Sequence, residues 1–201
     1  MSAQADAGQP CPASVSVIVP VFNEASTIDC LQDQLARFDL EAERCEVIFV
    51  DGGSTDGTRD KVRASYKLID QEGCGRGGAL NTGALASSGD VLFFLHCDSV
   101  LPASAFDELR EVLGERRVGS FGIRFDERSL VLLACQTMSN LRIRFRHISY
   151  GDQGLFIERD LFFEAGMFPD VPLMEDFQFA MNLRAMGEPL GMTQHRIRTS
   201  A

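Results

Sequence analysis

The sequence predicts an α/β fold with a mostly parallel central sheet and helices on both faces. In the first half of the chain, runs of β-branched and other apolar residues alternate with helix-compatible segments in the order β-α-β-α-β-α-β. The strand segments are apolar throughout, which is typical of parallel strands buried on both faces. Ligands of such sheets bind beyond the carboxyl ends of the strands, so the residues that follow each strand are the first candidates for a functional site.

The strands of the first half are predicted where β-branched runs meet turn residues. They fall at residues 15–21, 45–50, 67–69 and 91–95. A helix is expected after each of them. The helix after the first strand has apolar residues at helical spacing from Ile28. The helix after the third strand begins in the glycine-rich stretch 73–78, and the helix after the fourth begins near Pro102.

The second half is less regular. It is predicted to contain a strand at 118–125, a long helix at 129–146, a turn at 151–154 that leads to a strand and a short helix, and a last helix at 172–187. The last helix has Glu175 and Asp176 in its first turn and Gly187 as its stop. Residues 1–13 are predicted to be a flexible tail, followed by a single domain at 14–201.

Charge and cysteine usage restrict the class of protein. The chain has 19 basic and 29 acidic residues, a net charge of −10. This argues against nucleic acid as a partner and against strong adhesion to an anionic membrane. Six cysteines occur without a C-x-x-C pair, and no apolar signal segment precedes them, so we expect free thiols in a cytoplasmic protein.

The predicted helix at 129–146 combines an apolar face with Arg142, Arg144 and Arg146 near its end. One interpretation is a packed helix with a solvated basic end. The other is a peripheral contact with a lipid interface.

Acidic residues gather at the predicted carboxyl edge of the sheet. Glu24 follows the first strand, Asp51 follows the second, and Asp98 follows the strand at 91–95. Carboxylates that lie close together repel one another, and burying one without a partner is costly. Such a cluster needs a cation or hydrogen-bond donors, which predicts Mg²⁺ or Mn²⁺ together with a phosphate ligand. The alternative is that each acid is a solvated loop residue or a helix cap.

The stretch GCGRGG at 73–78 is neither a P-loop nor a dinucleotide motif after the first strand. Arg76 stands among its glycines, and a helix N-terminus follows. It could therefore reach a diphosphate with little steric hindrance. A surface arginine in a flexible turn is the alternative.

Six motifs in order along the chain resemble those of the family 2 glycosyltransferases, most closely the subgroup called rSAM/selenodomain-associated transferase 2. They are PVFNE (20–24), VDGGSTDGT (50–58), GRGGALNTGA (75–84), FLHCD (94–98), GDQG (151–154) and PLMED (172–176). The resemblance runs from about Val15 to the end. It implies a GT-A fold with a nucleotide-binding half at 14–100 and an acceptor-binding half at 101–201. It also implies inverting transfer of a sugar from a nucleoside diphosphate to an acceptor hydroxyl.

The resemblance assigns roles to individual positions. The nucleotide pocket is expected at Pro20, Phe22, Glu24, Asp51, Gly53, Arg76 and Asp98. Asp51 would accept a hydrogen bond from the base, and Arg76 would lie near the base and the diphosphate. His96 and Asp98 stand where the family often has Asp-x-Asp, so the divalent metal is assigned to Asp98 with His96 beside it. A zinc site made of His96, Cys97 and Asp98 is an alternative, although neighbouring strand residues point to opposite faces.

Asp176 stands at the family's base position, with Glu175 beside it, and inverting transfer needs a base on the acceptor hydroxyl. Helix-capping acids are the alternative for both. Asp152 and Gln153 are expected to line the acceptor side. The acceptor itself is not identified, and a lipid-linked one would suit the lipid interpretation of the helix at 129–146. Relatives typically continue beyond residue 201, so slow turnover is expected.

Two other functions remain open. A sugar-1-phosphate nucleotidyltransferase would also bind a nucleotide and a metal, but it usually has a basic glycine-rich loop where PVFNEAS stands here. A non-catalytic nucleotide-sugar-binding protein is the second.

Overall fold

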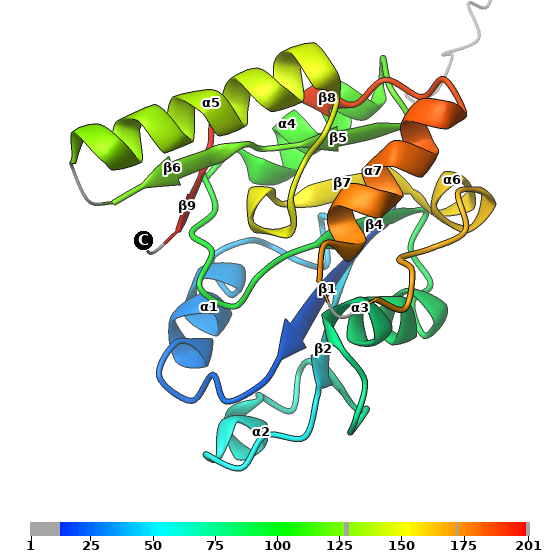
Figure 1. Cartoon of the computed structure of the whole chain (residues 1–201). Helices are drawn as coiled ribbons and strands as arrows, with labels where there is room; N and C mark the ends of the chain where they lie inside the picture. The colour runs from blue at the N-terminus through cyan, green and yellow to red at the C-terminus, as the bar shows by residue number, and fades with distance from the viewer. Residues whose placement is uncertain (1–12, 127–128, 172, 200–201) are drawn as a thin grey trace, which may run out of the picture.

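The computed structural model describes residues 13–126, 129–171 and 173–199. Residues 1–12 of the predicted tail and the predicted helix start at Pro172 lie outside the described residues. A central sheet has the strand order β3-β2-β1-β4-β7-β5-β8 (Figure 1). Its strands are β1 (Val15–Val21), β2 (Cys45–Asp51), β3 (Lys67–Asp70), β4 (Val91–Phe94), β5 (Val118–Ser120), β7 (Leu155–Glu158) and β8 (Gly191–Met192).

The sheet is mostly parallel, as the apolar strand segments predicted. β1 pairs in parallel with β2 and β4, and β3 extends this arrangement on the far side of β2. β7 is the exception, because it runs antiparallel between β4 and β5.

The predicted strand at 118–125 is in fact two strands. Gly122 has a φ of +70°, a conformation that residues with a Cβ adopt only at a cost. The chain turns there, and β6 (Ile123–Phe125) leaves the central sheet to pair with β9 (Ile197–Thr199). The prediction of one continuous strand was therefore wrong at this glycine.

Seven helices in the described ranges accompany the strands (Figure 1). They are α1 (Ile28–Leu35), α2 (Thr58–Lys61), α3 (Arg76–Leu85), α4 (Ala105–Leu113), α5 (Leu130–Arg146), α6 (Arg159–Glu164) and α7 (Glu175–Ala185). A short 3-10 turn, η1 (Gly151–Gln153), replaces the predicted turn before β7.

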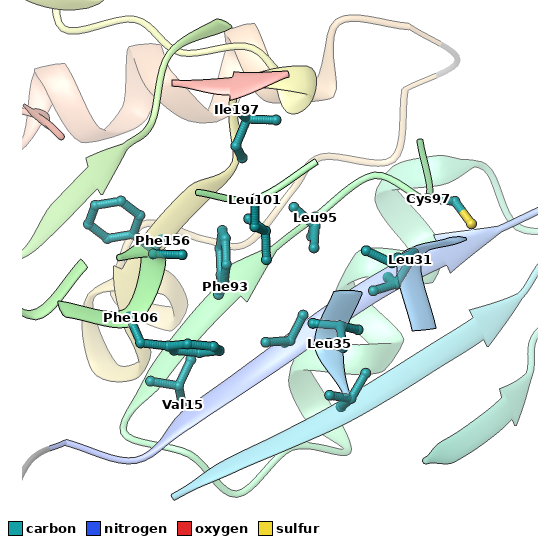
Figure 2. Packing of buried hydrophobic residues seen from close by; sticks show 14 of the residues in the cluster. Val15, Leu31, Leu35, Phe93, Leu95, Cys97, Leu101, Phe106, Phe156 and Ile197 are labelled. Atoms are coloured by element: carbon teal, nitrogen blue, oxygen red, sulfur yellow. The ribbon is translucent and has the colours of Figure 1, made fainter. Parts of the chain in front are cut away.

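Helices cover both faces of the sheet, because the strands carry apolar side chains on both faces and neither face is suited to contact with water. On one face, Val15 and Phe93 pack in a cluster with Leu35 of α1 and Phe106 of α4 (Figure 2). On the other face, Ile18 packs in a cluster with residues of α3, α6 and α7. The expected arrangement of helices on both faces is confirmed.

The small residues of α3 let this helix lie close to the sheet. A Cβ on Gly83 would come within 2.4 Å of Ile18 Cγ2 and within 3.2 Å of Val50 Cγ2. Only glycine therefore fits at this contact. The close approach fixes α3 on β1 and β2, and it places Arg76, the first residue of the helix, near the carboxyl ends of these strands.

α5 presents its polar face to the protein and its apolar face outward. Asn140 pairs with both backbone groups of Ile123, and Gln136 accepts a hydrogen bond from the Phe125 backbone, so these amides tie the helix to β6. Most of the large apolar side chains of the helix are exposed, Met138 by 68% and Phe145 by 72%. No helix within the described ranges has both the length and the apolar character that a bilayer crossing requires.

Candidate functional site

A cavity of about 470 Å³ opens where β1, β2 and β4 end. Its walls hold most of the residues that the sequence assigned to nucleotide and metal: Pro20, Phe22, Glu24, Arg76, His96 and Asp98. Val21, Gly52, Cys74, Gly75, Ala79 and Cys97 also line it. The structure thus brings together residues from four separate stretches of the sequence, and we call this space the donor cavity.

Two of the predicted pocket residues, Asp51 and Gly53, do not line the donor cavity. Asp51 is buried, and its Oδ2 accepts hydrogen bonds from the backbone N–H groups of Gly53 at 3.1 Å and Ser54 at 3.0 Å. Its Oδ1 is buried and has no hydrogen-bond partner among the described residues. Asp51 therefore shapes the loop after β2 with one oxygen and leaves the other as an unused acceptor beside Gly52 of the cavity wall.

Glu24 and Phe22 stand at the cavity on the loop that follows β1. The Glu24 carboxylate accepts a hydrogen bond from the Thr27 hydroxyl, and the Glu24 backbone N–H donates to Thr58 Oγ1 at 2.7 Å. Phe22 is 62% exposed, so its ring offers a free aromatic surface at the wall. The loop is held by hydroxyl groups, whereas the aromatic ring is left uncovered.

Asp98 reaches the donor cavity from the segment after β4. Its Oδ2 accepts a hydrogen bond of 2.9 Å from Thr199 Oγ1 of β9. His96 is mostly buried, and its Nε2 has no partner among the described residues. Burial first, and then the positive charge of Arg76, lower the pKa of His96, so the imidazole is neutral at pH 7.

Cys97 separates these two residues and belongs to the core cluster (Figure 2). Burial raises the pKa of its thiol to about 12, and the sulfur lies 3.6 Å from the Thr27 hydroxyl oxygen. In the described ranges, no three His, Cys, Asp or Glu side chains are placed to hold one metal ion together. The zinc alternative therefore has no support. Asp98 and His96 remain as candidate ligands, and one carboxylate is enough where substrate phosphates supply the other oxygens.

A second, small cavity of about 20 Å³ adjoins the donor cavity, since His96 lines both. Glu175, Asp176, Tyr150 and Gly151 are among its other lining residues. We call it the acid cavity. The two acids are the predicted catalytic pair, and the structure brings them beside the donor cavity.

Asp176 is held by two backbone donors. Its Oδ2 accepts a hydrogen bond of 2.7 Å from Gly151, and its Oδ1 accepts one of 2.7 Å from Phe177. A Cβ on Gly151 would lie 2.9 Å from His96 Nε2, so a larger residue there would require the imidazole to shift. The turn after α5 therefore fixes the orientation of the Asp176 carboxylate.

Arg76 links the two cavities. Its Nε donates to Glu175 Oε1 at 2.5 Å, and its Nη2 lies 3.7 Å from Asp176 Oδ2. The Glu175 side chain is 4% exposed, whereas that of Arg76 is 42% exposed. The sequence placed Arg76 near a diphosphate but did not predict that it is paired with the two acids.

Asp152 and Gln153 line neither the donor cavity nor the acid cavity. Gln153 is fully buried, and its Oε1 accepts hydrogen bonds from the Tyr150 backbone at 2.8 Å and from Arg142 Nη2 at 3.3 Å. The Arg142 guanidinium lies over the Tyr150 ring, 3.5 Å from its centroid. Burial raises the pKa of Asp152. Gln153 thus holds the turn that carries Gly151.

The residues that orient the acids carry little signal in the sequence. Thr199 is 101 residues from its partner Asp98, and Thr27, although close to Glu24 in the chain, is of a residue type common in loops and helix starts. Gly151 was the one available signal, because a glycine at a predicted turn can mark a close backbone approach.

Comparisons with known proteins identify the family. The model of the family "Glycosyl transferase family 2" matches residues 16–166. Glycosyltransferase AglE of Haloferax volcanii is 40% identical over 91 residues, which are 42% of this chain and 30% of that protein. Glucosyl-3-phosphoglycerate synthase of Mycobacterium tuberculosis is 30% identical over 102 residues, 46% of this chain and 31% of that protein. The chain thus spans about a third of these relatives.

Solved structures have the same fold. The mannosyltransferase PcManGT from Pyrobaculum calidifontis, in complex with GDP-Man and Mn²⁺, superposes with a TM-score of 0.72 at 26% identity, over 94% of this chain and 56% of that one. Residues 1–349 of S. aureus TarS, in complex with UDP-GlcNAc, give a TM-score of 0.75 at 20% identity, over 94% of this chain and 58% of that one. The expected GT-A fold is confirmed, and the chain belongs to glycosyl transferase family 2.

Proposed function

We propose that this protein transfers a sugar from a nucleoside diphosphate donor to an acceptor hydroxyl with inversion at the transferred carbon. The observation that carries the proposal is the donor cavity, where an acid-bearing loop, a basic residue at a helix start and a strand-end carboxylate face one space. Glu24, Asp98 and Arg76 come from different elements, and their combination suits a diphosphate. PcManGT, which has the same fold, was solved with GDP-Man and Mn²⁺.

In this proposal the nucleotide-binding half is 14–100 and the acceptor-binding half is 101–201. The unused Oδ1 of Asp51 accepts a hydrogen bond from the base, and Phe22 packs against the base or the ribose. Arg76 and the backbone N–H groups at the start of α3 bind the diphosphate, since no side chain of the described residues caps this helix N-terminus.

Asp98, with His96 beside it, would hold a divalent cation, Mg²⁺ or Mn²⁺, which neutralises charge on the departing diphosphate. The donor set suits this group, because such ions are commonly bound by one or two carboxylates together with substrate phosphates. The Thr199 hydroxyl orients Asp98 through one oxygen.

Asp176 is the base that accepts the proton of the acceptor hydroxyl. Its two backbone hydrogen bonds fix its direction before the acceptor arrives, which lowers the cost of reaching the reactive geometry. Asp152 and Gln153 act on the acceptor side by shaping the turn that carries Gly151.

The test of donor binding is a thermal-shift screen of nucleoside diphosphates and their sugars with Mn²⁺ and Mg²⁺, because only ligands that prefer the folded protein raise its melting temperature. Asp176→Asn should bind the donor as the wild type does. Its rate of sugar transfer, or of donor hydrolysis where no acceptor is known, should fall by at least about 100-fold. Equal rates in both proteins would require a different base.

The same assay separates the two other functions. A nucleotidyltransferase would release pyrophosphate from a nucleoside triphosphate, whereas a transferase of this family releases a nucleoside diphosphate. A non-catalytic binding protein would not hydrolyse the donor. Donor hydrolysis that wild type shows and Asp98→Ala lacks would therefore exclude this function. The family match favours the transferase.

The outward face of α5 suits the predicted contact with a lipid interface and a lipid-linked acceptor. Its exposed apolar residues include Leu130, Met138 and Phe145, and Arg144 and Arg146 stand beside them without a charge partner among the described residues. The helix has no acidic residue, although the whole chain has a net charge of −10. Charge acts locally in salt, over about 8–10 Å, so α5 can meet anionic lipid despite the overall balance.

Flotation with vesicles of mixed neutral and anionic lipid tests this contact. Phe145→Glu should lose vesicle binding, whereas Leu85→Glu, an equally polar change at an exposed position of α3, should not. An absence of binding by wild type would favour the interpretation of α5 as a helix with a solvated basic end.

A further inference from the structure

Glu175 and Asp176 are neighbours in the sequence, and helix capping or catalysis could explain either. The structure gives them different surroundings. Asp176 uses both carboxylate oxygens to accept backbone N–H groups, whereas the Glu175 carboxylate is paired with the guanidinium of Arg76. Glu175 lines the acid cavity but not the donor cavity, and Arg76 lines the donor cavity.

The Glu175 side chain is packed against the start of α3. A Cβ on Gly77 would lie 3.2 Å from Glu175 Cγ and 3.3 Å from the Pro169 carbonyl oxygen. With only 4% of its side chain exposed, Glu175 has little room to move toward an acceptor. These contacts fit an anchoring role better than the role of a base.

The bond to Glu175 uses the Nε–H of Arg76, and Nη2 also lies within ion-pair distance of Asp176. Arginine has five N–H donors, and the bond to Glu175 occupies the one on Nε. Among the described residues, no acceptor lies within hydrogen-bond distance of the Nη atoms, and Asp176 Oδ2 is 3.7 Å from Nη2. The Nη atoms belong to a side chain that lines the donor cavity.

We infer that Glu175 is a positioning residue: it holds Arg76 by Nε, so that the N–H groups on the Nη atoms stay available to hydrogen-bond the diphosphate of the donor. This inference rests on the proposed binding of a nucleoside diphosphate in the donor cavity. Because Glu175 belongs to α7 and Arg76 to α3, the pair also ties the base-bearing helix to the donor side. A donor in place would find Arg76 already oriented, which reduces the entropy lost on binding.

The test is a double-mutant cycle on ligand affinity, measured by calorimetry with Mn²⁺. The probes are GDP and UDP, and the matching nucleosides that lack phosphate. Glu175→Gln should weaken diphosphate binding about tenfold, the scale of a charge-assisted hydrogen bond, and leave nucleoside binding unchanged. In an Arg76→Gln background, Glu175→Gln should have no further effect.

Arg76→Lys and Glu158→Gln complete the design. Lysine keeps a positive charge beside Glu175 and so preserves the fold, but its single ammonium group cannot hold Glu175 and a phosphate on separate edges; we expect a loss of diphosphate affinity like that of Arg76→Gln. Glu158→Gln removes a similar bond, from Arg117 Nε at 2.6 Å, on residues that do not line the donor cavity, and should leave affinity unchanged.

Several results would overturn the inference. Equal losses for nucleoside and diphosphate, or additive losses in the double variant, would mean that Glu175 acts only on the fold. Unchanged affinity together with a fall in donor hydrolysis of about 100-fold or more would make Glu175 the base. If wild type binds neither GDP nor UDP in the presence of Mn²⁺, the proposed donor site is wrong. The wild-type titration thus tests the proposed function separately from the role of Glu175.

Discussion

The close contact between Gly83 of α3 and Ile18 of β1 predicts that Gly83→Ala destabilises the protein, the opposite of its usual effect in a helix. In an ordinary exposed helix, Gly→Ala raises the free energy of unfolding by about 1 kcal/mol, because alanine favours the helix. At Gly83 the new Cβ would lie 2.4 Å from Ile18 Cγ2, well inside contact distance. Ile18 is fully buried in the central strand β1, so neither its branched side chain nor the backbone can move away freely.

Overpacking of this kind costs about 1–3 kcal/mol, and so short a distance puts Gly83→Ala at the upper end. After the gain in helix propensity, the net loss is about 2 kcal/mol. For a protein of this length, this lowers the melting temperature by about 4–8 °C. Urea unfolding and thermal unfolding, both followed by circular dichroism, measure the two quantities.

The double variant Gly83→Ala/Ile18→Ala provides the control. Ile18→Ala alone should cost about 2–5 kcal/mol, because it leaves a cavity. In the double variant the new methyl group occupies part of this space. Its loss of unfolding free energy should therefore be smaller, by about 1–2 kcal/mol, than the sum of the losses of the two single variants. A Gly83→Ala protein that is more stable than wild type would refute the argument that close packing requires this glycine.

Three further predictions concern single groups. Asp98→Ala should abolish the increase in diphosphate affinity that Mn²⁺ produces, without changing affinity in EDTA, as measured by calorimetry. Burial raises the pKa of Glu108, but the hydrogen bonds that it accepts outweigh this effect and the net pKa is lowered. Its contribution to stability is thus fully present above its unfolded pKa of about 4.3 and is lost as the pH falls through its lower folded pKa, so Glu108→Gln should destabilise at pH 7 and progressively less in acid, as urea unfolding over a pH series would show. Cys97, whose pKa is raised to about 12, should resist iodoacetamide at pH 8 while the exposed Cys30 and Cys135 react, as mass spectrometry of peptides would show.

The strands of the first half were predictable because they are continuous apolar runs with turn residues at both ends. β1 has the predicted bounds, and β2 and β3 are each one residue longer than predicted. The carboxyl-edge rule then located Pro20, Glu24 and Asp98 at one cavity without any knowledge of side-chain positions. Sequence patterns work here because burial on two faces leaves little freedom in residue choice.

The second half was less predictable because its pairing depends on distant partners. Nothing local in LFIE indicates that β7 runs antiparallel between β4 and β5. Likewise, α5 was expected either to pack its apolar face or to present it to lipid, and the amides of Gln136 and Asn140 decide the orientation by bonding to β6. A hydrogen bond to an edge strand has no periodic signal in sequence.

The acids of the site have the kind of partners that their clustering in the sequence predicts. Converging carboxylates need a cation or hydrogen-bond donors, and each acid of the site has donors. They are the Thr27 hydroxyl for Glu24, the Thr199 hydroxyl for Asp98, and paired backbone N–H groups for both Asp51 and Asp176. The cluster is therefore compatible with folding before any metal binds. Under the proposed function, a diphosphate adds its own negative charge to these acids and a cation offsets it, so we predict that metal and donor bind with positive cooperativity. Calorimetry of Mn²⁺ alone, compared with Mn²⁺ in the presence of the diphosphate, would measure this coupling, and equal metal affinity in both titrations would contradict it.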